Sequence, residues 1–191
     1  MVKTILYFHG FASSSNSNKA KLIKNYFSKL SKNINVFTPD LKNNFSKAIV
    51  QINQLINMSD REIAFMGSSL GGYYASIFSN LSNSKAVLIN PAISPLIGFE
   101  KYLGENKNYS TGEKFYISKK DIKFLRLFGK KKFRNQKNTL ILLESGDDVL
   151  NYLETVSYYK GSRIDIKFGG THSYDSMNIK LQKICDFLKI Y

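Results

Sequence analysis

The sequence has little of several residue types, and each shortage excludes a class of protein. The single cysteine, Cys185, rules out an internal disulfide and any cluster of thiols that could hold a metal ion. No apolar run approaches the roughly 18 residues that a membrane span requires. The first residues, MVKTILYFHG, contain a short apolar run without a small-residue cleavage site, so we expect no signal peptide. These shortages favour a cytoplasmic protein.

Arginine is also scarce, although the formal net charge is +14. The chain has 24 lysines and four arginines. Clustered basic residues can bind nucleic acid or anionic lipid, but arginine is the side chain better suited to phosphate and base contacts. We therefore interpret the charge as a solvated lysine surface and expect no nucleic-acid partner.

The chain has the length and apolar content for one compact domain over residues 1–191, with 43% hydrophobic residues. Short β-rich runs alternate with longer segments of helical periodicity. This alternation predicts a mostly parallel sheet with helices on both faces, joined by right-handed crossovers. Strands are expected at 4–8, 34–38, 62–66, 85–89, 139–143 and 163–168, and helices at 19–30, 45–56, 69–81, 150–159 and 176–190.

One interval is too long for an ordinary crossover between neighbouring strands. Residues 91–138 separate the fourth and fifth expected strands, where far fewer residues would suffice. This segment holds twelve basic and four acidic residues, so much of the excess charge is local. We expect it to form a basic cap.

The segment FMGSSLGGYY, residues 65–74, contains the pattern G-x-S-x-G between an expected strand and an expected helix. In that context the serine, Ser69, lies in a sharp strained turn that presents its hydroxyl above the sheet edge. Gly67 and Gly71 avoid the collisions that side chains two residues before and after would cause, and Gly72 lets the helix pack closely. We predict Ser69 as a nucleophile and Ser68 as a structural neighbour.

A serine hydroxyl needs a base within hydrogen-bond reach to become a nucleophile. The chain has two histidines. His9 ends the first expected strand and precedes Ser69, whereas His172 follows the last expected strand. In sheets of this kind the order along the chain is serine, acid, histidine, which selects His172.

The acid is expected after the strand that precedes the histidine's strand, where the sequence reads LLESGDDVLNY. Glu144, Asp147 and Asp148 are the candidates there. Asp147, the first carboxylate after the Gly146 bend, is our choice to fix the tautomer of His172 and stabilise the imidazolium. Asp148 is the alternative, or it favours the N-terminus of the next helix. Asp165, flanked by isoleucines in a strand, is expected to face solvent.

Acyl transfer also requires hydrogen-bond donors for the developing oxyanion. The backbone N–H of Leu70, directly after the serine, is one expected donor. The loop HGFASSSNS after the first strand supplies the second, and Phe11 N–H is the expected group because Gly10 lets the chain fold back there. Ser15 or Ser17 is expected to cap the helix that follows.

Several blocks of the chain resemble the YqiA-like esterases, a group of small bacterial α/β-hydrolases. They are YFHGFASSSNSNKA, MGSSLGGYYA, NPA at 90–92, YLGENKNYSTGEKFY, GDDVLNY and GGTHSY, in the family's order and spacing over nearly the whole chain. The resemblance implies a serine hydrolase with Ser69, Asp147 and His172 at the matching positions, and the fold implies the strand order 2-1-3-4-5-6. Two departures are Ser15, where the family commonly has proline, and the pair Asp148 and Asn151, which replaces Glu and Asp.

We therefore predict an α/β-hydrolase fold that cleaves acyl esters or thioesters through an acyl-enzyme, with no metal or organic cofactor. Aromatic residues mixed with lysines in the cap suggest a hydrophobic acyl slot with a basic entrance, suited to anionic substrates such as acyl-CoA; the alternative is a cap that only packs its aromatics and solvates its lysines. The rival function is a basic binding protein for nucleic acid or anionic lipid with an idle triad.

Overall fold

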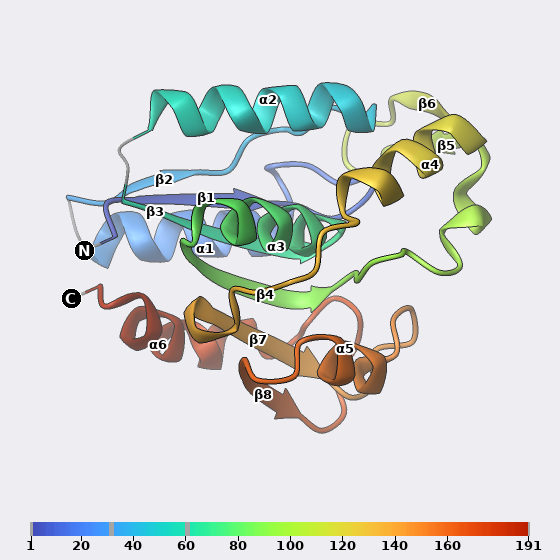
Figure 1. Cartoon of the computed structure of the whole chain (residues 1–191). Helices are drawn as coiled ribbons and strands as arrows, with labels where there is room; N and C mark the ends of the chain where they lie inside the picture. The colour runs from blue at the N-terminus through green and yellow to red at the C-terminus, as the bar shows by residue number, and fades with distance from the viewer. Residues whose placement is uncertain (1, 31–32, 60–61, 191) are drawn as a thin grey trace.

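The computed structural model describes residues 2–30, 33–59 and 62–190. The predicted domain also includes residues 1, 31, 32, 60, 61 and 191, which lie outside the described residues. Six parallel strands form one sheet in the order β2-β1-β3-β4-β7-β8, which is the predicted order (Figure 1). The strands are β1 (Thr4–Phe8), β2 (Asn35–Phe37), β3 (Ile63–Ser69), β4 (Lys85–Pro91), β7 (Thr139–Glu144) and β8 (Arg163–Lys167).

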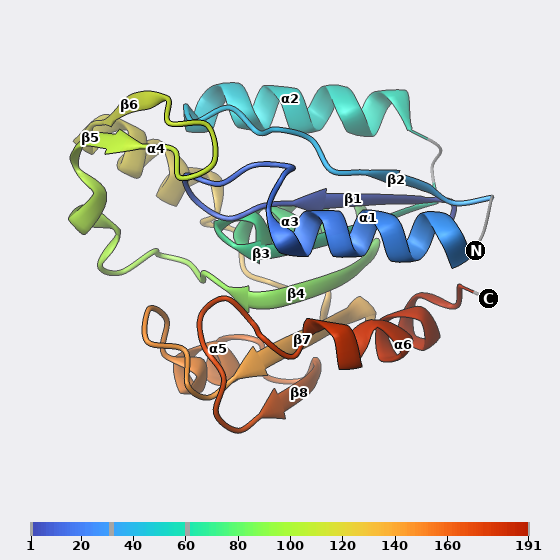
Figure 2. The same ribbon diagram turned by 180° about the vertical axis from the view of Figure 1, so that it is seen from behind.

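Helices cover both faces of this sheet, because alternate strand residues point to opposite sides and both sets are apolar. Ile5 and Tyr7 of β1 pack in a core with α1 and α6, which lie together on the face seen in Figure 2. Leu6 and Phe8 pack in a second core with α2 and α3 on the opposite face. The main helices are α1 (Asn18–Leu30), α2 (Phe45–Met58), α3 (Leu70–Ser82), α5 (Tyr152–Tyr158) and α6 (Met177–Leu188).

Residues 91–138, here called the cap segment, lie between β4 and β7 and contain little of the sheet's regularity. They form the short helix η1 (Phe99–Tyr102), the hairpin β5 (Gly104–Lys107) and β6 (Lys114–Ile117), α4 (Lys119–Phe128) and η2 (Gln136–Asn138). The hairpin and α4 lie beyond the carboxyl ends of β1 and β3 (Figure 1). The hairpin reaches the loop after β1, since Tyr109 N–H donates to Ala12 O at 2.8 Å and Asn108 Nδ2 donates to Ser13 O at 2.9 Å.

The environment predicted for Asp165 is wrong. Its side chain is only 10% exposed and pairs with Lys180, at 2.8 Å, and with Lys183. Both lysines come from α6, which packs over that end of the sheet. The two isoleucines around Asp165 suggested simple alternation, but a helix far along the chain covers the position.

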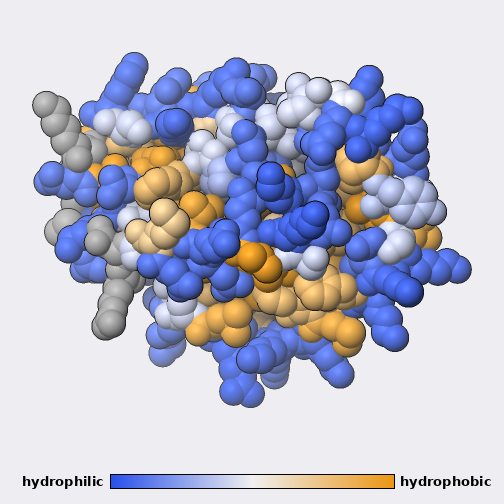
Figure 3. Space-filling view, turned by 90° about the horizontal axis from the view of Figure 1, so that it is seen from above, coloured by the Kyte–Doolittle hydropathy of each residue, from blue (hydrophilic) through white to orange (hydrophobic). Residues whose placement is uncertain are grey.

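The surface carries most of the polar residues in an even spread. On the side where α2 lies in Figure 1, the face seen from above is mostly hydrophilic, with separate apolar patches between the polar side chains (Figure 3). Among the described residues, no helix is both long and apolar enough to span a bilayer.

Candidate active site

The turn between β3 and α3 has the strained geometry that the serine pattern predicts. Ser69 has φ 55° and ψ −122°, outside the regions that a serine ordinarily occupies. A Cβ at Gly67 would lie 2.2 Å from the carbonyl oxygen of Gly71, and a Cβ at Gly71 would lie 2.0 Å from that of Phe8. Only glycine therefore fits at either position, because backbone atoms cannot yield by that much.

The side chains of Ser69, His172 and Asp147 form one hydrogen-bonded chain in the structure. Ser69 Oγ lies 3.0 Å from His172 Nε2, and Asp147 Oδ2 lies 2.8 Å from His172 Nδ1. With a proton on Nδ1, the imidazole donates to the carboxylate and accepts from the hydroxyl. The Asp147 side chain is 2% exposed and that of His172 is 24% exposed, so the acid is sheltered and the histidine borders on solvent.

Both oxygens of Asp147 have partners. While Oδ2 faces His172, Oδ1 accepts from the N–H groups of Val149 at 2.9 Å and Leu150 at 2.8 Å. These two bonds hold the carboxylate in one orientation. They also bend the chain, so that α5 begins at Tyr152, two residues later than predicted.

Asp148, the alternative acid, is exposed, and it is not the cap of the helix. Asn151 is the N-cap of α5, where its side chain accepts from Leu153 N–H at 2.9 Å. The prediction that Asp148 favours the helix N-terminus is therefore wrong, because Asn151 satisfies the first turn. At α1 the expected cap is present, since Ser17 Oγ accepts from Ala20 N–H at 3.3 Å.

The two predicted oxyanion donors lie on the backbone beside Ser69. Leu70 follows the serine as the first residue of α3, where a backbone N–H has no acceptor within its own helix. Phe11 follows Gly10, whose Cβ position is 3.4 Å from Ser69 Cβ. The ring of Phe11 packs at 4.4 Å, centroid to centroid, against Tyr102 of the cap segment. Their role as donors stays a prediction.

His9, the histidine that chain order rejects, has a structural position. Its Nδ1 lies 2.9 Å from Gly10 O, and Leu41 N–H donates to its Nε2 at 3.0 Å. Burial lowers the pKa of His9, which favours the neutral ring that these two contacts require. The ring thus ties the end of β1 to the loop after β2.

Glu144, the third candidate acid, is buried and does not contact His172. Its carboxylate accepts from the N–H groups of Thr171, Asp175 and Ser176, at 2.8, 3.0 and 2.8 Å. Burial alone would raise the pKa of Glu144, but the hydrogen bonds from Ser176, Thr171 and Asp175 outweigh it and lower the pKa. The group is therefore ionised at neutral pH.

Asn90, at the end of β4, is a buried residue that the sequence reading did not select. Its Oδ1 accepts from Glu144 N–H at 3.0 Å, and its Nδ2 donates to Thr171 O at 3.0 Å and to His172 O at 3.3 Å. The only signal for Asn90 in the sequence was its place in the block NPA. Nothing near it along the chain indicates these partners.

A cleft of about 470 Å³ opens above Ser69. Lys19 is the one Lys or Arg side chain on its lining among the described residues, and its ammonium donates to Ser173 O. Burial lowers the pKa of Lys19, although the charges of Asp175, Glu144 and Asp147 oppose that effect. The cap segment contributes Tyr102 and Tyr109 to this cleft and none of its lysines. The lining residues are Tyr7, Gly10, Phe11, Ser13, Ser17, Asn18, Lys19, Ser68, Ser69, Tyr102, Tyr109, Val149, His172 and Ser173.

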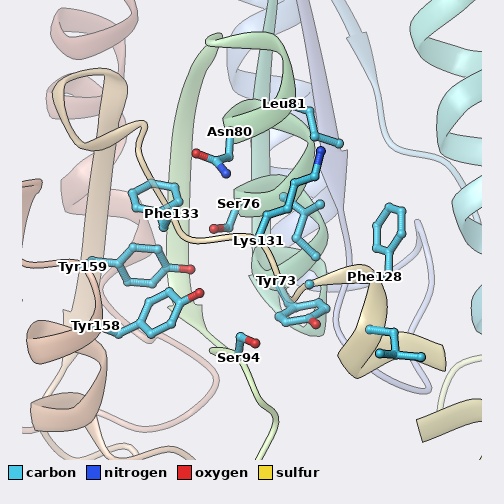
Figure 4. A pocket seen from close by; sticks show the side chains of 13 residues that line it. Tyr73, Ser76, Asn80, Leu81, Ser94, Phe128, Lys131, Phe133, Tyr158 and Tyr159 are labelled. Atoms are coloured by element: carbon cyan, nitrogen blue, oxygen red, sulfur yellow. The ribbon is translucent and has the colours of Figure 1, made fainter. Parts of the chain in front are cut away.

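A second cavity, of about 270 Å³, shares no lining residue with this cleft. It lies between α3, the end of α4 and α5, and Figure 4 shows the hydroxyls of Ser76, Tyr158 and Tyr159 directed toward its interior. Lys131 extends along the opposite wall in the same view. The cavity contains none of the predicted site residues.

Comparisons with known proteins agree with the geometry. The family model described as "Uncharacterised protein family (UPF0227)" matches residues 4–189. The UPF0227 protein YcfP of Escherichia coli O139:H28 is 24% identical over 189 residues, covering 96% of this chain and 97% of YcfP. This match confirms the resemblance found in the sequence.

Solved structures with the same fold are more distant in sequence. Alpha/beta hydrolase domain-containing protein 10 from mouse superposes with a TM-score of 0.73 at 16% identity, covering 99% of this chain and 90% of that one. Est1E from Butyrivibrio proteoclasticus superposes with a TM-score of 0.70 at 16% identity, covering 98% and 87%. The predicted α/β-hydrolase fold is thus confirmed.

Proposed function

This chain belongs to the UPF0227 family, and we propose that it is a serine hydrolase that cleaves acyl esters or thioesters. One observation carries the proposal: Ser69, on a strained turn, is hydrogen-bonded to His172, which is hydrogen-bonded to Asp147. The three residues come from segments far apart in the sequence. A hydroxyl, an imidazole and a carboxylate in this order can activate an oxygen nucleophile at neutral pH.

In the first half of the reaction, Ser69 Oγ attacks the acyl carbonyl carbon while His172 Nε2 takes the hydroxyl proton. Asp147 holds the ring and stabilises the imidazolium. The oxyanion accepts hydrogen bonds from the N–H groups of Phe11 and Leu70. When the tetrahedral intermediate collapses, His172 gives its proton to the departing alcohol or thiol, and Ser69 carries the acyl group.

In the second half, a water molecule replaces the leaving group. His172 takes a proton from this water as it attacks the acyl-enzyme, and returns the proton to Ser69 Oγ as the acid departs. Each atom and charge in this cycle is supplied by the substrate, water and these residues, so the mechanism needs neither a metal nor an organic cofactor.

The cleft supports a small-molecule substrate. Aromatic rings of Phe11, Tyr102 and Tyr109 line one part of it and suit an apolar acyl group, whereas Ser13 and Lys19 line another part and suit a polar leaving group. An acyl-CoA thioester combines both features and stays a candidate substrate. The cytoplasm, with its reduced thiols, is the compartment we propose for this activity.

The test is hydrolysis of a p-nitrophenyl ester by the wild-type protein and by Ser69→Ala. Removing the nucleophile should lower kcat by roughly 10⁴-fold to 10⁶-fold. A fluorophosphonate should label the wild-type protein at Ser69 alone, as mapped by peptide mass spectrometry. Turnover that survives Ser69→Ala, or a label on another residue, contradicts the proposal.

The rival binding function predicts a different pair of results. An idle site would leave the ester uncleaved, and binding to random DNA or anionic vesicles would weaken steeply as salt rises. Ester turnover without such a salt slope supports the hydrolase.

A further inference from the structure

The loop that carries His172 has no regular secondary structure. It runs from the end of β8 to the start of α6, over residues 168–176. The contacts of the imidazole with Ser69 and Asp147 require the loop backbone to be held within a fraction of an ångström. Helix or sheet hydrogen bonds cannot provide this, so other groups must.

The carboxylate of Glu144 holds the loop from inside the protein. Its three acceptor bonds go to the N–H groups of Thr171, Asp175 and Ser176, which lie on both sides of His172 along the chain. The loop also approaches very closely, since a Cβ at Gly170 would lie 2.0 Å from Glu144 Oε2. An ionised carboxylate accepts at both oxygens and donates nothing, which matches three backbone donors.

Asn90 holds the same loop through its carbonyl groups. Its Nδ2 bonds Thr171 O and His172 O, and its Oδ1 accepts from the backbone N–H of Glu144. Asn90 also lies two residues before Ala92, whose N–H donates to Ser69 O at 3.0 Å. The ends of β4 and β7 thereby connect the serine turn to the histidine loop.

We propose that Glu144, assisted by Asn90, is a positioning residue for His172. It touches neither the imidazole nor the cleft; it fixes the loop backbone so that the ring reaches Ser69 and Asp147 together. This inference rests on the proposed serine hydrolase function.

The experiment replaces Glu144 by glutamine and measures ester hydrolysis per folded molecule. Glutamine has the same shape, but its NH2 group faces backbone donors, so at least one bond to the loop is lost. Because a displacement of about 1 Å at a reacting group costs about 10²-fold in rate, we expect kcat to fall about 10²-fold with KM nearly unchanged.

Asp165→Asn is the matched control. Asp165 is also a mostly buried carboxylate, on the neighbouring strand β8, but its partners Lys180 and Lys183 lie on α6. Its loss removes ion pairs without touching the histidine loop, so kcat should change by less than roughly threefold. An equal loss of kcat in both variants overturns the inference, because it indicates a general effect of lost buried charge.

A double-mutant cycle separates positioning from any other role. In a His172→Ala background, where only the residual activity on an activated ester remains, Glu144→Gln should have no further effect on kcat. A further tenfold or greater loss in that background overturns the proposal, because Glu144 would then act without His172.

Glu144→Asp covers the case in which the glutamine variant does not fold. It keeps the charge but withdraws the carboxylate by one methylene, and we expect a smaller loss of kcat, about tenfold, that again disappears with His172→Ala. Full activity of a folded Glu144 variant contradicts the positioning role alone. Full activity of Ser69→Ala contradicts the proposed function itself, so the two failures are distinguishable.

Discussion

The carboxyl edge of the sheet and the cap segment differ in how their charges are used. At the edge, the acidic groups are buried and have fixed partners: Asp147 bonds His172, and Glu144 bonds three backbone N–H groups. In the cap segment the charges are exposed, as in the pair Lys114 and Glu105, whose side chains are 70% and 67% exposed. Such surface pairs contribute little to stability. The region with the most charge is therefore not the region with the candidate chemistry.

The largest contrast is expected between two adjacent aspartates at the edge. Asp147→Asn removes the charge that faces His172 and should lower kcat by about 10⁴-fold. Asp148→Asn changes an exposed neighbour and should leave kcat within about twofold. Steady-state kinetics on a p-nitrophenyl ester measures both. Equal losses in the two variants contradict the assignment of Asp147.

Stability should also distinguish the two regions. Gly71→Ala places a methyl group 2.0 Å from Phe8 O and should cost about 3 kcal/mol or more in the free energy of unfolding. Gly112→Ala in the cap segment meets only a lysine side chain at 3.6 Å, so its cost is the strain of φ +75°, about 1 kcal/mol. Urea denaturation of the two variants tests this order, and a reversed order would contradict the packing described for the turn.

Acid should expose the difference between a buried and a surface glutamate. The pKa of Glu144 is lowered in the folded state. Its stabilisation is therefore present above the unfolded pKa, about 4.3, and lost as the pH falls toward the folded pKa. We expect the wild-type protein to lose stability below about pH 5, and Glu144→Gln to flatten that dependence. Glu105→Gln is the control and should leave the slope unchanged, as measured by urea denaturation across pH.

The smallest effect is expected from the cap lysines. Replacing Lys101 and Lys107 by glutamine should leave kcat/KM for a neutral ester within about twofold, since neither lysine lines the cleft. For an acyl-CoA substrate the same variant should lose a few-fold at low salt, because exposed cations mainly steer encounter and are screened by salt. If the salt dependence is the same for both substrates, the basic entrance proposed for acyl-CoA is excluded.

Local patterns in the sequence predicted most of the elements. The six strands were expected within a few residues of where they lie, because each is a short apolar run between polar segments. Their order was confirmed as well. The candidate site was expected from the sharp turn at Ser69 and from chain order, and its catalytic role remains a proposal.

The predictions that failed depend on contacts between distant segments. The partners of Asp165 lie on α6, and the first turn of α5 is capped by Asn151 rather than Asp148. The roles of Glu144 and Asn90 could not be predicted either, since their partners in the histidine loop are 27 to 32 and 81 to 82 residues away.

The amino-acid sequence by itself determined which segments become strands and helices, and where glycine is obligatory, because periodicity and steric exclusion act over a few residues. The tertiary structure alone decided which carboxylate contacts His172 and which holds its loop. Glu144 and Asp147 are three residues apart and chemically alike, and only the distant backbone and side-chain groups around each carboxylate separate their environments.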